Sequence, residues 1–150
     1  MTRAAQAGRW IAGFSTIATV AIVAIADVFN ATHLFNPNWS GHARFHIGMQ
    51  FTTLVLVALV SLAALLGPPS RERNFVAAIA SLTFWPGLLV AYMIPGTDVY
   101  ASEALREIGF PINILLSLVF IALTLIGLIV SNRAVTDHQA GGTGSHQNFS

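Results

Sequence analysis

Four long apolar segments dominate the pattern of hydrophobic and polar positions along the chain. They cover residues 11–26, 47–66, 75–94 and 110–130. The last three contain no charged side chain, and each is close to the ~20 residues that a helix needs to cross a bilayer core. The pattern predicts an all-α integral membrane protein, a four-transmembrane-helix bundle. We expect its spans at about 10–29, 44–66, 75–94 and 110–131.

The polar segments between these spans predict how the helices are connected. Residues 67–74 contain two prolines and three charged residues, as in a tight turn between antiparallel helices. The connection at 95–109 is longer and contains a candidate surface helix over 102–108. From Thr136 onward Gly, Ser, His and Gln dominate, so we expect one transmembrane domain over 1–135 and a disordered tail over 136–150.

Composition excludes several classes of protein. The 150 residues are 55% hydrophobic and only 9% charged, whereas an ordinary soluble domain has about 25% charged residues. A net charge of +1 offers no basic surface, so no nucleic-acid partner is expected. The absence of Cys excludes disulfides and thiolate metal sites. The bilayer is the expected environment.

Arginine is the only strong cation in the chain, and its placement predicts the orientation. A four-span arrangement puts most of the arginines on the side of both termini, namely Arg3, Arg9, Arg71, Arg73 and Arg133. Arg44 and Arg106 fall on the other side. The positive-inside rule then predicts that both termini are cytoplasmic, and we expect the membrane to be a bacterial plasma membrane.

Ionisable residues gather around the connection between the first two spans. Asp27 ends the first span, His33 follows it, and His42 and His46 open the second. If Ser40 or Gly41 caps that helix, His42 and His46 lie one turn apart on one face. Two such imidazoles can hold a metal ion, or one can bind a haem iron. A simple hydrogen-bonded cluster at the membrane interface is the alternative.

Other polar residues fall inside the predicted spans and must face protein or a cavity. Gln50 lies one turn below His46, and Thr52 lies about 120° away around the helix. Trp85 and Tyr92 share a face of the third span, and Pro86 between them removes a backbone donor. Asn113 begins a polar stripe with Ser117 and Thr124, which either joins helices or lines a cavity.

The sequence Ala43-Arg44-Phe45-His46-Ile47-Gly48 resembles a motif of the styrene oxide isomerases, which are small four-span membrane proteins. The resemblance implies a homotrimer with haem b at the subunit interface. It further implies that an aryl epoxide is rearranged to an aldehyde, with ferric haem as the Lewis acid. An Asn of that family's second span is replaced here by Thr52, and the first connection, 30–37, has no counterpart.

The resemblance also assigns roles to individual residues. It implies that His46 is the axial ligand of the haem iron and that Tyr92 contacts the substrate. Thr52, Gln50 and Asn113 are candidates for further substrate contacts. Arg44 at the membrane boundary is a candidate partner for a haem propionate. Asp27 is expected to bind His46 Nδ1–H or to pair with Arg44.

Three other interpretations remain open at this point. One is a metal-dependent hydrolase or oxygenase with ligands from Asp27, His33, His42 and His46. Another is a cofactor-free isomerase, similar to the emopamil-binding group, in which Asp27 and His46 transfer protons. The third is a haem-binding or structural subunit without catalytic activity.

Overall fold

Helices account for nearly all of the regular structure in the computed structural model, which describes residues 2–100 and 102–143 and side chains up to 137. The four long helices are α1 (Arg3–Val23), α2 (Gly41–Ala64), α3 (Arg71–Tyr92) and α5 (Ile112–Thr143). Each is long and apolar enough to cross a membrane. The predicted all-α fold with four helices able to span a membrane is therefore confirmed, and no strand occurs in the described ranges.

The helix starts follow from local capping. The hydroxyls of Ser40 and Ser70 accept hydrogen bonds from backbone amides three residues later, at 3.2 Å each, and begin α2 and α3. Ser102 does the same for the short helix α4 (Glu103–Ile108), which ends at Gly109 with φ of 70°. The predicted surface helix over 102–108 and the predicted Ser40 cap are thus confirmed.

The largest differences from the expected spans are at two boundaries. α1 begins at Arg3 rather than near residue 10, because Thr2 caps it by accepting the amide of Ala5. α5 continues to Thr143, eight residues into the predicted tail. The rest of that tail, 144–150, lies outside the described residues.

A five-residue π-helix, η1 (Ala24–Val28), ends the first span, and the sequence pattern did not predict it. The Phe29 amide donates to the Ala24 carbonyl at 2.8 Å, and the Asn30 side chain donates to the Ile25 and Ala26 carbonyls. These bonds satisfy carbonyls that the wider turn leaves free. Asp27 therefore sits on a π turn.

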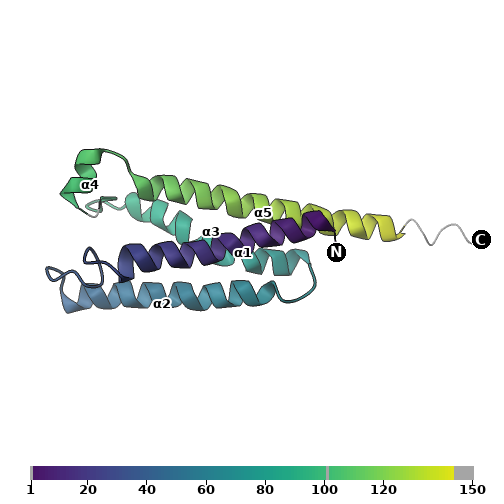
Figure 1. Ribbon diagram of the computed structural model, residues 1–150, viewed down its shortest axis with the longest axis horizontal. Coiled ribbons are helices and arrows are strands. Elements are labelled where there is room, and N and C mark those ends of the chain that lie inside the picture. Colours follow the sequence, from purple (N-terminus) through teal and green to yellow (C-terminus); the bar gives the residue numbers. More distant parts are fainter. Residues whose placement is uncertain (1, 101, 144–150) are drawn as a thin grey trace, which may run out of the picture.

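The bundle places α1 between α2 and α5, with α3 behind it (Figure 1). The start of α1 and the end of α5 lie at the same end of the molecule, which we call the terminal end. α1 and α5 approach most closely there. A Cβ built on Gly8 would lie 2.6 Å from the Gly127 carbonyl oxygen, so only glycine fits at this crossing.

Hydroxyl groups replace large apolar side chains in the middle of the bundle. Ser15 Oγ lies 2.6 Å from Thr124 Oγ1 and 3.1 Å from Ser81 Oγ, and Thr19 Oγ1 lies 3.0 Å from the same Ser81. All four residues are fully buried. Thr124 of the predicted polar stripe therefore joins helices, which was one of its two predicted roles.

Candidate functional site

A cleft of about 780 Å³ opens in the half of the bundle away from the terminal end. We call it the central cleft. Its walls come from the end of α1 and η1, the following loop, the middle of α2, the second half of α3 and the start of α5. Residues of the connection between α3 and α5, among them Val99, Tyr100, Leu105 and Phe110, complete it. Every element of the chain thus contributes to one space.

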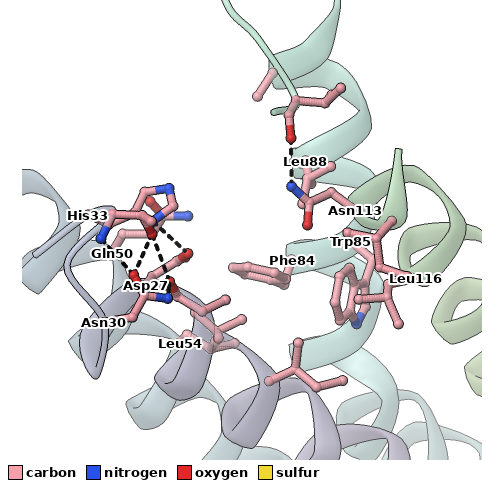
Figure 2. A pocket seen from close by; sticks show the side chains of 18 of the residues that line it. Asp27, Asn30, His33, Gln50, Leu54, Phe84, Trp85, Leu88, Asn113 and Leu116 are labelled. Carbon is pink, nitrogen blue, oxygen red and sulfur yellow. Dashed lines mark hydrogen bonds and ion pairs between the residues drawn. The ribbon is translucent and has the colours of Figure 1, made fainter. Parts of the chain in front are cut away.

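One wall of the central cleft holds a linked set of polar side chains (Figure 2). Asp27 Oδ1 lies 3.6 Å from His33 Nδ1, and these side chains are 24% and 26% exposed. Gln50 of α2 lines the same wall, one turn below His46 as the sequence predicts. The structure therefore joins residues from a π turn, a loop and a second helix.

The loop after η1 fixes His33 in front of Asp27. Asn30 Oδ1 accepts the Thr32 amide at 2.7 Å and is also bonded to the Thr32 hydroxyl. The hydroxyl lies 2.8 Å from His33 Nδ1, and the His33 ring packs edge-on against Trp39 with centroids 5.4 Å apart. Sequence reasoning missed Asn30 and Thr32. The sequence pattern that could have indicated them is an Asx turn at Asn30, directly before a histidine.

The opposite wall is mainly apolar and comes from α3 and α5 (Figure 2). Trp85 is 2% exposed, stacks on Phe120 with centroids 5.1 Å apart, and donates its indole N–H to Thr19 at 2.8 Å. Phe84, Leu88 and Leu116 lie beside it. Asn113 also lines the cleft, but its amide donates to the Val99 carbonyl at 2.9 Å.

His42 and His46 lie outside the central cleft. His42 Nε2 and His46 Nε2 are 3.0 Å apart, and both residues are exposed on α2. The predicted placement on one helix face is confirmed. Arg44 and Thr52 line a separate shallow depression with Phe45 and Gly48, which we call the outer hollow.

Three sequence expectations differ from this arrangement. Asp27 pairs with His33 rather than with His46 or Arg44, because the loop after η1 folds back over the π turn. Tyr92 is 55% exposed and does not line the cleft that contains Trp85. Within the described residues no group of three or more potential metal ligands forms: Asp27 and His33 make one pair, and His42 and His46 make another.

Comparison with known proteins adds no further identification. No protein-family model, curated protein or solved structure matches the chain. The features that bear on function are therefore the geometry of the central cleft, the exposed histidine pair and the motif resemblance.

Proposed function

We propose that the protein is a membrane-embedded isomerase that rearranges an epoxide to a carbonyl compound in the central cleft. The observation that carries the proposal is the Asp27–His33 pair, 3.6 Å apart, on the wall of a largely apolar cleft. A carboxylate next to an imidazole is suited to giving and taking back one proton. Apolar walls disfavour water, which would trap a cationic carbon as a diol.

The proposed chemistry needs no co-reactant. Protonated His33 gives its Nε2 proton to the epoxide oxygen while one C–O bond breaks, and Asp27 beside Nδ1 stabilises the imidazolium beforehand. A hydride then moves from the carbon that keeps the oxygen to the neighbouring cationic carbon. The hydroxyl proton returns to His33, which leaves a carbonyl group, so atoms and electrons balance within the substrate. Gln50, which lines the same wall, is the proposed amide contact for this oxygen.

Styrene oxide is the probe for this activity, with the purified protein in lipid nanodiscs and phenylacetaldehyde measured by gas chromatography. Asp27→Asn and His33→Ala should each lower kcat at least 100-fold, since a positioned acid or base contributes about 10²–10⁴-fold. Asp137→Asn is the matched control, because Asp137 is exposed on α5 toward the terminal end. Full activity of Asp27→Asn would exclude this mechanism.

A haem-dependent form of the same reaction is the second candidate, and the exposed pair His42–His46 favours it. An iron porphyrin with propionates can be bound by an accessible imidazole together with a guanidinium and an aromatic ring. Here the guanidinium and the ring are those of Arg44 and Phe45, which share the outer hollow. His46 would hold the iron and Arg44 a propionate, while Thr52 and Tyr92 would contact the substrate. Bound haem b would supply a Lewis acid.

An absorption spectrum of the purified protein separates the two candidates. A Soret band that His46→Ala abolishes, together with loss of turnover in that variant, would favour the haem-dependent form. Turnover that survives His46→Ala but not Asp27→Asn would favour the acid–base form. Absence of turnover in a folded wild-type protein would exclude both for this substrate.

We further propose a homotrimer in a bacterial plasma membrane, with both termini in the cytoplasm. The resemblance supports the trimer, and an outward-facing His46 would be covered by a neighbouring copy. The arginines near the terminal end support the orientation. A green fluorescent protein fused to the C-terminus should fluoresce in cells, whereas periplasmic alkaline phosphatase fused there should be inactive.

A further inference from the structure

The size of the central cleft exceeds that of a single-ring epoxide. One water occupies about 30 Å³ of liquid, so 780 Å³ has room for about 25 heavy atoms. Styrene oxide has nine. The volume lies within the range of ~300–1,000 Å³ typical of sites for drug-sized ligands. A one-ring molecule would leave most of the space unfilled.

Most of the polar groups that remain available to a ligand lie on one side of the cleft. On α3, Thr83 Oγ1 donates to the carbonyl of Ile79 at 2.8 Å, and the Trp85 indole is bound to Thr19. On α5, the Asn113 side-chain N–H is bound to Val99, which leaves its Oδ1 as an isolated acceptor. Asp27, His33 and Gln50 on the other wall retain acceptors or donors for a bound molecule.

We infer that the natural substrate is an elongated, lipid-like molecule of about 15–25 heavy atoms with a single polar group. The polar group lies against Asp27 and His33, and the apolar body extends past Phe84 toward Trp85 and Leu116 (Figure 2). The inference rests on the proposed function in one respect only, namely that the polar group is an epoxide. The size and the single polar end follow from the cleft itself.

Gly87 of α3 provides a direct way to test the inference. It lines the cleft, and a Cβ built on it has no atom within 4 Å. The Cβ of a larger residue is therefore accommodated at this position, so Gly87→Leu is expected to fill part of the cleft, and leucine is also the better helix former. Ala63→Leu on α2 is the matched control, because Ala63 is exposed and lines neither the central cleft nor the outer hollow.

The probes are 1,2-epoxyoctane and 1,2-epoxyhexadecane, with binding to each protein in nanodiscs corrected for partition into empty nanodiscs. Each buried methylene should raise affinity about fourfold, so the longer epoxide should bind at least 100-fold more tightly to the wild type. Gly87→Leu should weaken binding of the C16 epoxide at least tenfold and that of the C8 epoxide less than threefold. Ala63→Leu should change neither affinity.

Equal affinities for the two epoxides, or no effect of Gly87→Leu, would overturn the inference. Ala91→Leu narrows the same cleft one turn further along α3 and replaces Gly87→Leu if that variant does not fold. Turnover is measured in the same samples. Chain-length-dependent binding without any rearrangement would overturn the proposed isomerase while supporting the inferred ligand class.

Discussion

Trp85 separates the open half of the bundle from the packed half. Its ring faces the central cleft, while its indole N–H reaches Thr19 in the buried hydroxyl cluster. Stacking on Phe120 fixes the ring from the α5 side. One side chain thus supplies an apolar surface for a ligand and a hydrogen bond for the bundle.

Trp85→Phe should therefore destabilise the protein without emptying the site. It keeps an aromatic ring but removes the donor to Thr19, which costs about 1 kcal/mol for a hydrogen bond between neutral groups. Unfolding in mixed micelles of increasing SDS content measures the change. Trp10→Phe is the control, because Trp10 is 70% exposed, and it should unfold with the wild type. Equal losses in both variants would contradict the assigned bond.

At the scale of single elements, the π-helix η1 determines the orientation of Asp27. A π turn contains one residue more than an α-helical turn would use, so it rotates the residues around it relative to a continuous α-helix. Asn30 then satisfies carbonyls of Ile25 and Ala26, which keeps the wider turn closed. The acid of the site and its supporting loop therefore depend on the same irregular turn.

Deletion of Ile25 should remove the π turn and, with it, a carbonyl that Asn30 binds, so the loop that holds His33 in front of Asp27 loses its support. Circular dichroism should show unchanged helix content, whereas styrene oxide turnover should fall at least 100-fold. Ile25→Ala keeps the register, and Ile25 is 69% exposed, so this control should remain active. An active deletion variant would show that the π turn does not position the acid.

The crossing of α1 and α5 at Gly8 and Gly127 is the tightest contact between two elements. Gly8→Ala would push a methyl group to within 2.6 Å of the Gly127 carbonyl oxygen and the Ser131 amide. Overpacking of this kind costs about 1–3 kcal/mol, and SDS unfolding should show a loss in that range. Gly48→Ala, with open space around its Cβ, should be neutral or stabilising by up to ~1 kcal/mol.

At the scale of the whole molecule, Arg9 links all four long helices near the terminal end. Its guanidinium donates to the carbonyls of Leu65 and Gly67 after α2, at 2.7 and 2.8 Å, and to Asn74 of α3 at 3.2 Å. Asn74 in turn donates to Asn132 of α5 at 3.0 Å. A buried cation is thus neutralised by carbonyl and amide dipoles at the end of a helix.

Arg9→Ala should unfold at clearly lower SDS content than the wild type. It leaves the Leu65 and Gly67 carbonyls without their donor, and each unsatisfied group costs about 1–3 kcal/mol. Arg3→Ala is the control, since Arg3 is exposed on the same helix. If both variants unfold together, the network does not hold the helices together.

Much of the fold could be predicted because it depends on local signals. Apolar runs of about 20 residues define the spans, and Ser40 and Ser102 mark helix starts through their hydroxyls. The π turn could not be predicted, since a single extra residue hardly changes hydrophobic periodicity. The pairing of Asp27 with His33 also could not, because it depends on how Asn30 folds the loop back.

The fold brings some of the predicted site residues together and keeps others apart. Gln50 and Asn113 do line the cleft with Asp27, as their burial cost inside a membrane suggests. His46 and Tyr92 remain on the outside of a single chain. Helix periodicity gives the face of a residue, but it does not say whether that face meets another helix, lipid or a second copy.

The connection between α3 and α5 has a consequence for how the substrate range can change. Val99 and Tyr100 line the cleft from this connection, and its ion pairs of Arg106 with Asp98 and Glu103 lie on exposed side chains. The buried hydroxyl cluster and the Gly8–Gly127 crossing involve no residue of it. Insertions or deletions there can alter the height of the cavity while folding is preserved, so ligand length is an evolvable property of one loop.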